Sequence, residues 1–325
     1  MPCTTFPSAF FRILVGDCPR LCRAAHPGRG AAIFLPLLLT LTILLPTGRT
    51  EAAAPIEVTD DTGVSVRLDR PATRIIALYG AYSELLLALD ARNLLAARTV
   101  ADAQLPELAD LPAVGTHMRP NAELIVAQKP DLVLQLAGRR EALLQTEALR
   151  KLGVNVLTFE MDSFDKMFGV LEKLGRLTGR ERQAAGLIRD WSALRARNAG
   201  RKPLRVFYEV RYPNLLAAGQ GSIVNEIIAA AGGENVVGDD KKLVRFNEEA
   251  LIQADPDAYL IQKGPMNPDP QPLTERAHYR DLRAARAGRV LVVDEDRFAR
   301  PGPRSVEAAE ELEKWLHPAD EREKQ

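Results

Sequence analysis

The chain has 325 residues, of which 46% are hydrophobic and 26% charged, and its formal net charge is zero. This length suggests two domains, the composition is that of a soluble protein with an ample core, and the balanced charge does not favour a nucleic-acid partner. The cysteines are Cys3, Cys18 and Cys22. The chain after Cys22 therefore holds no disulfide, thiolate zinc site or iron–sulfur cluster.

The first 53 residues have the pattern of an export signal. Several arginines precede the apolar run 31–45, and Ala52-Ala53-Ala54 offers small residues for cleavage. We therefore expect an exported protein that is cleaved near Ala53/Ala54. The apolar run is short for a bilayer span, which takes about 20 residues. An uncleaved anchor, and a translation start downstream of Met1, remain alternatives.

Residues 54–162 are predicted to form an N-terminal α/β lobe. An alternating hairpin pattern surrounds Asp61-Thr62-Gly63, and strand and helix patterns follow in turn. The expected strands are 74–78, 94–99, 132–135 and 154–159, and the expected helices are 83–90 and 140–152. Such alternation predicts a parallel sheet with covering helices.

Residues 163–200 are predicted to form a helical bridge. Apolar residues recur at spacings of three and four, which is the stripe of an amphipathic helix. Thr178-Gly179 is expected to interrupt the stripe, because glycine favours a helix end. The second part, from about residue 180 to residue 198, would be a rod of roughly 27 Å at 1.5 Å per residue.

Residues 201–325 are predicted to form a C-terminal lobe of the same kind. The expected strands are 204–210, 259–262 and 290–293, the expected helices are 223–231 and 306–316, and residues 297–304 are expected to be a loop. The glycines at 232–233 end the first of these helices. Gly219-Gln220-Gly221-Ser222 could seat an anion ahead of that helix, but a helix cap is the favoured interpretation.

A short sequence motif occurs in both lobes, and its two copies are 126 residues apart (247 − 121). In both copies a short helix, a Pro-Asp turn and a buried strand follow one another. This order indicates a duplicated α/β unit, or two lobes of the same plan. The matching residues are Asn121, Glu123, Pro130 and Asp131 in the first copy, and Asn247, Glu249, Pro256 and Asp257 in the second.

The sequence contains none of the catalytic motifs that we sought. It has no G-x-G-x-x-G after a strand, no Walker loop, no H-E-x-x-H and no G-x-S-x-G. We therefore predict no catalytic residue. The histidines after residue 53 are only His117, His278 and His317, which argues against a zinc-uptake protein and against a resident metal.

Loops at the carboxyl ends of predicted strands carry the candidate ligand-binding residues, because ligands of open α/β sheets bind at this edge. Arginine suits carboxylates and other delocalised anions, while tyrosine and histidine can ligate or hydrogen-bond an iron chelate. Each also has a structural alternative, as a solvated or core residue. The candidates are Tyr79, Tyr82, His117, Met118, Arg119, Arg211, Tyr212, Arg300 and Arg304.

Several short sequence motifs, distributed over the chain after residue 53, match those of one family. They are Val58-Thr-Asp, Arg74-Ile-Ile-Ala-Leu78, Glu84-Leu85, Val114-Gly-Thr116, Asn121-Ala-Glu123, Lys129-Pro-Asp-Leu132, Leu149 to Gly153 and Gly232-Gly-Glu-Asn235. In these the chain resembles the periplasmic substrate-binding proteins of iron-siderophore, haem and cobalamin ABC importers. The resemblance implies two Rossmann-like lobes with mainly parallel sheets, joined by a single long helix, and a ligand in a shallow cleft between the lobes.

The resemblance further implies a periplasmic monomer that binds a small-molecule metal chelate, has no cofactor of its own and is not an enzyme. It implies that one glutamate on each lobe docks into arginine pockets of the importer's permease dimer. By motif match these are Glu123 and Glu249, with the adjacent Glu248 as an alternative to Glu249. Taken on their position alone, both glutamates are first-turn helix residues favoured by the macrodipole.

The ligand's identity does not follow from the resemblance. Cobalamin binders of the family line the cleft with tryptophans, whereas His117 stands at one of those positions here. Trp191 and Trp315, the only tryptophans, fall on predicted helices away from the cleft. We therefore expect a ferric siderophore, with haem or cobalamin as alternatives. An enzyme on paired Rossmann-like lobes is the alternative of a different class.

Overall fold

The structure, a computed structural model, describes residues 54–138 and 140–318. These residues belong to one compact unit. The predicted export signal, residues 1–53, lies outside the described ranges. Among the described residues, none of the helices combines the length and the hydropathy that a bilayer span requires.

The first lobe contains a four-stranded parallel sheet with the strand order β4-β3-β5-β6. An antiparallel hairpin precedes it, as the alternating pattern around Asp61-Thr62-Gly63 predicted. The hairpin strands are β1 (Ile56–Thr59) and β2 (Ser65–Leu68), and the sheet strands are β3 (Ile75–Ala77), β4 (Leu95–Ala97), β5 (Leu132–Leu136) and β6 (Val156–Phe159). The helices are α1 (Gly80–Ala88), α2 (Ala122–Ala127) and α3 (Arg140–Lys151), with short 3-10 turns at 92–94, 101–104 and 106–108.

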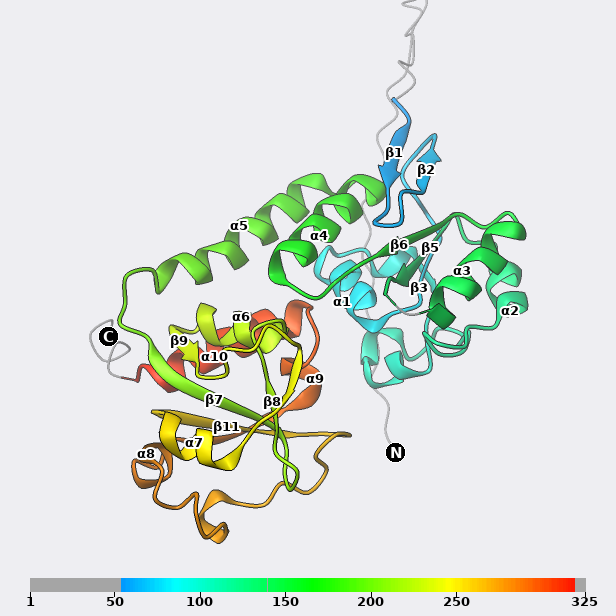
Figure 1. Ribbon diagram of the computed structural model, residues 1–325. Coiled ribbons are helices and arrows are strands. Elements are labelled where there is room, and N and C mark those ends of the chain that lie inside the picture. The colour runs from blue at the N-terminus through cyan, green and yellow to red at the C-terminus, as the bar shows by residue number, and fades with distance from the viewer. Residues whose placement is uncertain (1–53, 139, 319–325) are drawn as a thin grey trace, which may run out of the picture. The chain divides into compact units, whose positions relative to one another are not determined.

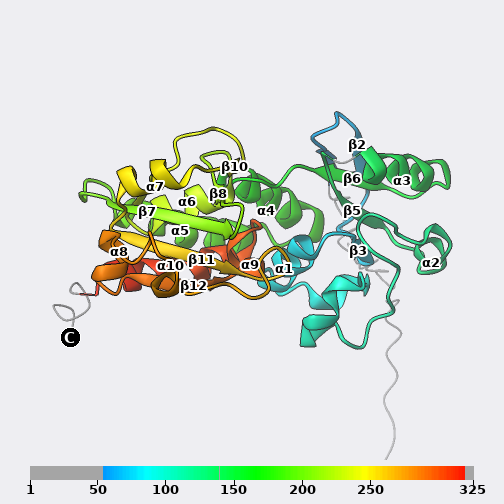
Figure 2. The same ribbon diagram turned by 60° about the horizontal axis from the view of Figure 1, so that its bottom comes forward.

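Both faces of this sheet are buried, which explains why its strands are apolar without alternation. Ile75, Leu132 and Leu134 belong to the core that includes α1. Ile76 and Val133, one residue further along the same strands, pack on the other face against residues of α2 and α3. Figure 2 shows α2 and α3 next to each other beside this sheet.

The second lobe contains a six-stranded sheet with the order β10-β8-β7-β11-β12, and β9 also pairs with β7. β9, β7, β11 and β12 pair in parallel, whereas β8 pairs antiparallel with both of its neighbours, β7 and β10. The strands are β7 (Leu204–Arg211), β8 (Leu216–Ala218), β9 (Gly233–Asn235), β10 (Leu243–Arg245), β11 (Ala258–Lys263) and β12 (Val290–Asp294). The helices are α6 (Ile223–Ala230), α7 (Glu248–Ala254), α8 (Arg283–Arg286), α9 (Glu295–Phe298) and α10 (Pro303–Leu316), with a 3-10 turn at 273–275.

Two details of this lobe differ from the sequence-based expectation. Gly232, with a φ of +78°, does end the preceding helix, but the chain then enters strand β9 at once. The loop expected at 297–304 is shorter, because α9 extends to Phe298 and α10 begins at Pro303. Elements of three or four residues are too short to show a period in the sequence.

The second sheet is also covered on both faces. Tyr208 and Leu260 belong to the core that contains α6 and α10. Phe207, Tyr259 and Ile261 point to the opposite face, where they cluster with residues of α7 and α8. Figure 1 shows α6 and α10 on one side of β7 and β11, and α7 and α8 on the other. The prediction of two α/β lobes with mainly parallel sheets is therefore confirmed.

The bridge between the lobes consists of α4 (Phe164–Thr178) and α5 (Glu181–Arg197). Gly179 ends α4 in the left-handed conformation, as predicted. The two helices pack together, and a Cβ on Gly175 would lie 2.7 Å from the Cβ of Ala184. The long helix is α5, which spans roughly 26 Å at 1.5 Å per residue.

Hydrogen bonds attach α5 to one lobe at each end. The Arg180 guanidinium donates to the carbonyl oxygens of Leu89 and Asp90 in the first lobe, at 2.9 and 2.7 Å. At the other end the Asn198 amide donates to the carbonyl of Ala230 in the second lobe, at 2.8 Å. The helix therefore joins the two lobes directly.

The repeated Pro-Asp motif has the same structural role in both lobes. Asp131 accepts from the backbone N–H of Arg74 at 2.9 Å, where β3 begins. Asp257 accepts from the backbone N–H of Arg205 at 2.9 Å, where β7 begins. Each aspartate thus connects the start of its own strand, β5 or β11, to the start of the parallel neighbour. Burial of the two carboxylates raises their pKa, but these hydrogen bonds outweigh it and leave each pKa below the ordinary value.

Glu226, in the first turn of α6, connects the second lobe to the start of the bridge. Its Oε2 accepts from the backbone N–H of Phe164 at 2.6 Å. Burial raises the pKa of the Glu226 carboxyl above its ordinary value, with Asp165 and Asp162 adding to the shift and Arg195 opposing it. Ionisation of Glu226 is therefore less favourable in the folded protein than in the unfolded chain.

This raised pKa predicts a pH-dependent stability. The stabilising contribution of Glu226 is fully present below the unfolded value of 4.5 and is lost as the pH rises through the higher folded value. Glu226→Gln keeps an oxygen acceptor for Phe164 but does not titrate. In urea denaturation its free energy of unfolding should match that of wild type at about pH 4 and exceed it at about pH 8. A wild type that is the more stable protein at both pH values would contradict this.

Candidate ligand-binding cleft

A cavity of about 500 Å³ lies where the carboxyl ends of the two sheets face each other. The first lobe contributes residues at or just after the carboxyl ends of β3, β5 and β6. The second lobe contributes residues of β7, β8, β10 and β11, the start of α6 and the residue after β12. The lining residues are Tyr79, Leu136, Ala137, Gly138, Glu160, Met161, Asp162, Val210, Ala218, Gly221, Ser222, Ile223, Val224, Lys242, Leu243, Gln262, Met266, Glu295, Ala299 and Pro301.

This position agrees with the rule that ligands of open α/β sheets bind beyond the carboxyl ends of the strands. The lining is largely aliphatic, with Met161 and Met266 from opposite lobes and Tyr79 as its aromatic side chain. A cavity of this size and composition is typical of a small-molecule site. We refer to it as the cleft.

Two carboxylates in the cleft are paired with lysines. Lys166 Nζ lies 2.6 Å from Glu160 Oε2 and 2.9 Å from Asp162 Oδ1. Lys242, from the second lobe, lies 3.2 Å from the other oxygen of Asp162. Burial alone would raise the pKa of Asp162, but the two ammonium groups outweigh it and leave the pKa below its ordinary value. The Lys242–Asp162 pair therefore connects the two lobes at the wall of the cleft.

The third carboxylate of the lining, Glu295, is held by backbone. Its Oε2 accepts from the N–H of Met266 at 2.9 Å. The chain approaches so closely here that a Cβ on Gly264 would lie 2.4 Å from the Cβ of Glu295. No cation of the described residues forms an ion pair with Glu295. Glycine at 264 thus allows the loop after β11 to fix this carboxylate.

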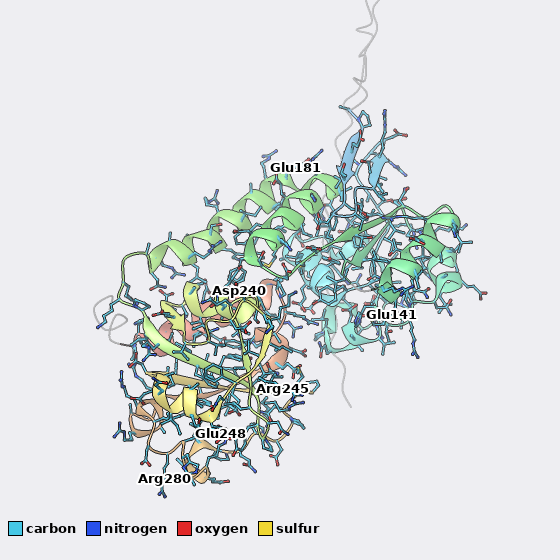
Figure 3. The ribbon with its side chains drawn as sticks, in the orientation of Figure 1. Glu141, Glu181, Asp240, Arg245, Glu248 and Arg280 are labelled. Carbon is cyan, nitrogen blue, oxygen red and sulfur yellow. The ribbon has the colours of Figure 1, made fainter. Side chains whose placement is uncertain are left out.

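The glycines at 219 and 221 position the loop that carries Lys242. A Cβ on Gly219 would lie 2.2 Å from the carbonyl oxygen of Lys241, and a Cβ on Gly221 would lie 2.2 Å from that of Asp240, the loop residue labelled in Figure 3. Ser222 accepts from the N–H of Val224 and caps α6. The helix-cap interpretation of this segment is confirmed.

Of the aromatic candidates, Tyr79 lines the cleft and Tyr82 does not. Tyr82 is fully buried and donates its hydroxyl to the carbonyl of Phe159 at 2.7 Å. The rings of both Tyr82 and His117 pack edge-on against Tyr79, with centroids 5.6 and 6.2 Å away. The structure thus places Tyr82 in the core, behind Tyr79.

The loop with His117, Met118 and Arg119 borders the cleft without lining it. His117 and Met118 are half-buried and Arg119 is exposed. The carbonyl of His117 accepts from the side chain of Gln135 at 3.2 Å, one residue before Leu136 enters the lining. Of the three, His117 is the residue whose contacts place it beside the cleft, through Tyr79 and Gln135.

Arg300 and Arg304 both turn to a carboxylate of the other lobe. Their Nη2 atoms lie 2.7 and 2.6 Å from the same Oε1 of Glu84, a residue of α1 that is only 6% exposed. Neither arginine lines the cleft. The structure therefore gives these two candidates a role in holding the lobes together, since Glu84 and the arginines belong to different lobes.

Arg211 and Tyr212 do not line the cleft either. Arg211 is exposed, and Tyr212 packs its ring under the guanidinium of Arg276, 4.0 Å from the ring centroid. That guanidinium forms a bidentate ion pair with the fully buried Glu209. Tyr212 thus belongs to a buried polar cluster of the second lobe.

Sequence reasoning missed most of the polar residues that do line the cleft: Glu160, Asp162, Lys242, Gln262 and Glu295. Glu160 and Glu295 each come directly after a strand, β6 and β12. Their position at a strand end was the available signal. It was outweighed by a preference for arginine, tyrosine and histidine as chelate contacts.

The two repeated glutamates occupy equivalent positions on their lobes. Each is the second residue of a short helix whose N-cap is an asparagine, Asn121 for α2 and Asn247 for α7. Both glutamates are exposed. Glu248, labelled in Figure 3, is the first residue of α7, so the structural equivalent of Glu123 is Glu249.

Comparisons with known proteins agree with this architecture. A family model described as periplasmic binding protein matches residues 75–297. The chain is 25% identical over 311 residues to YvrC, an uncharacterized ABC transporter substrate-binding lipoprotein of Bacillus subtilis (strain 168), which covers 89% of this chain and 97% of that protein. It is 28% identical over 227 residues to the vitamin B12-binding protein of Salmonella choleraesuis, covering 64% and 77%.

A solved structure of similar fold comes from Saccharomonospora viridis and is described as an ABC-type Fe3+-hydroxamate transport system. It matches with a TM-score of 0.58 and 25% identity, covering 81% of this chain and 99% of that one. The family model and the relative from Bacillus subtilis each extend over both lobes and the bridge. The chain therefore belongs to the periplasmic binding protein family and is a substrate-binding protein of ABC importers.

Proposed function

We propose that this protein captures a ferric siderophore in the cleft and delivers it to the permease dimer of an ABC importer. The observation that carries the proposal is the cleft itself. Its volume of about 500 Å³ lies within the usual range for small-molecule sites, and its lining combines aliphatic side chains with a few polar groups. A bulky chelate with an apolar periphery fits such a lining.

The tryptophans count against cobalamin. Trp191 packs on Phe168 in the bridge, with ring centroids 6.5 Å apart, and Trp315 packs against the core from α10. Neither lines the cleft. Cobalamin stays an alternative because of the resemblance to a vitamin B12-binding protein. The cleft, however, has no tryptophan that would contact a cobalamin.

The arginines count against haem. The two carboxylates of haem call for cationic partners, and guanidinium groups are the usual choice. Arg300 and Arg304 are engaged by Glu84, and among the described residues no arginine lines the cleft. Tyr79 could still ligate a haem iron, so the binding experiment includes haem beside the ferric siderophore.

We further propose that the protein acts without catalysis, as an exported periplasmic monomer. The predicted signal at residues 1–53 and the membership of the family support export. Glu123 and Glu249 are proposed to meet the permease, one from each lobe.

Calorimetric titration of the purified protein tests the ligand class. We expect a ferric siderophore to bind with a Kd of about 1 µM or tighter, equivalent to about −8 kcal/mol, and cyanocobalamin and haemin to bind at least about tenfold more weakly. Preferential binding of cobalamin, or of haemin with a Soret band, would overturn the proposed ligand.

A matched pair of variants tests the location. Leu243→Trp places a large side chain in the cleft, whereas Ile252→Trp places the same side chain on α7, and both parent residues are 45% exposed. Loss of binding in the first variant alone would support the cleft as the site. Equal binding in both variants would place the site elsewhere.

A further inference from the structure

We propose that the cleft selects ferric chelates without net negative charge, and that Glu295 is the residue that rejects anionic chelates. This inference rests on the proposed function and names the charge class of its ligand. It starts from the ionisable groups of the lining: the carboxylates of Glu160, Asp162 and Glu295, and the ammonium of Lys242.

The two ammonium groups at the wall of the cleft, those of Lys166 and Lys242, are already engaged. Lys166 contacts both Glu160 and Asp162, and Lys242 contacts Asp162. Three carboxylates therefore stand against two ammonium groups, which leaves one negative charge in excess. Since Glu160 and Asp162 share the two lysines, the excess charge belongs to Glu295.

Arg300, which stands between two lining residues, and Arg304 do not change this balance. Arg300 and Arg304 converge on Oε1 of Glu84, which is almost fully buried. If either arginine turned from that oxygen toward a ligand, its ion pair with Glu84 would be lost. The buried Glu84 carboxylate would then be less well paired. Among the described residues no guanidinium lines the cleft, so an anionic chelate would meet Glu295 without one in the lining to offset it.

Glu295 is also held in place. The N–H of Met266 binds its Oε2 at 2.9 Å, and Gly264 lets the backbone approach its side chain. Swinging away from an anion would break this hydrogen bond. In a partly desolvated cavity, charge repulsion is stronger than in water, so a fixed like charge discriminates between ligands of equal shape.

Binding of ferrioxamine B and of two N-acylated forms of it tests this inference, because the three chelates share one iron core and differ in net charge. The free amine form carries +1, the N-acetyl form is neutral and the N-succinyl form carries −1. Calorimetry should show that wild type binds the N-succinyl form at least about tenfold more weakly than the N-acetyl form. Glu295→Gln should reduce that difference to less than about threefold by gaining affinity for the N-succinyl form.

Glu147→Gln is the control, since Glu147 is an exposed carboxylate on α3 outside the cleft. It should keep the wild-type preference. Equal binding of the N-acetyl and N-succinyl forms by wild type, or an unchanged preference in Glu295→Gln, would overturn this inference while leaving capture of a ferric siderophore intact. If none of the three chelates bound while haemin or cobalamin did, the proposed function would fail and this inference with it.

Discussion

Replacing Arg276 with alanine is expected to lower the free energy of unfolding by about 3–5 kcal/mol, the cost of removing one partner of a buried ion pair. Arg276 Nη2 donates to Glu209 Oε1 at 3.0 Å, Nη1 binds Oε2, and the hydroxyl of Tyr259 donates to the same Oε2 at 2.6 Å. Both members of the pair are buried. Without Arg276, the Glu209 carboxylate would remain in the core of the second lobe with only a phenol as donor.

Guanidinium denaturation and thermal melting measure this effect. For a chain of this size, the loss corresponds to a fall in Tm of roughly 10 °C. Arg189→Ala is the control, because Arg189 pairs with Asp190 on the surface with 76% of its side chain exposed, and it should change stability by less than about 1 kcal/mol.

A double variant separates the ion pair from the loss of packing. Arg276→Met with Glu209→Gln removes both charges, so it should recover much of the stability that Arg276→Ala loses. A stability of Arg276→Ala equal to that of wild type would show that Glu209 finds another partner. It would also show that the buried pair is dispensable.

The second large effect concerns transport. Under the proposed docking, the double charge reversal Glu123→Lys with Glu249→Lys should abolish stimulation of the importer's ATPase in vesicles, or reduce it at least about tenfold. The reason is that two lysines would then repel the arginines that the proposal places in the permease. Both glutamates are exposed N2 residues of short helices, one on each lobe. Ligand affinity should stay near wild type, because neither residue lines the cleft, and Tm should stay near wild type, because both side chains are exposed.

The surroundings of these glutamates add a detail to the proposed docking. One helical turn after each glutamate stands an exposed aliphatic residue, Val126 and Ile252, again at the offset of 126 (252 − 126). Residues three apart on a helix share a face, so each lobe presents a carboxylate beside an apolar side chain. A permease site with an arginine beside an apolar contact would match both.

A control of equal charge completes the experiment. Glu147→Lys with Glu275→Lys makes the same change in net charge at exposed positions elsewhere. This variant should stimulate the importer like wild type. If the Glu123 and Glu249 double variant also did so, the two glutamates would serve only as first-turn helix residues.

Much of the fold was predictable because its determinants are local. Apolar runs bounded by Pro-Asp turns predicted β5 and β11, and the recurrence of Asn, Glu, Pro and Asp predicted the common plan of the lobes. The three-and-four spacing with Thr178-Gly179 predicted both α4 and α5. Strands such as β8, β9 and β10 escaped prediction, since each has three residues and depends on a neighbouring strand for its hydrogen bonds.

The site was predictable only in its position. Parallel strands have their carboxyl ends at one edge, so the topology predicted the location of the cleft, and Tyr79, expected in the loop after β3, lines it. The arginines were expected there too, because they follow strands in the sequence. Nothing local distinguishes a guanidinium that faces a ligand from one that binds a carboxylate of the other lobe.

The sequence by itself thus determined the class of fold, the bridge and the family, because periodicity, turn residues and short phrases act over a few neighbouring residues. Only the tertiary structure decided which side chains face the cleft. Glu84 lies more than two hundred positions before Arg300 and Arg304 in the chain, yet it is their ion-pair partner, and Asp162 meets Lys242 from the opposite lobe. Charges pair with whatever lies within a few ångströms of them, and that proximity exists only after the two lobes have packed together.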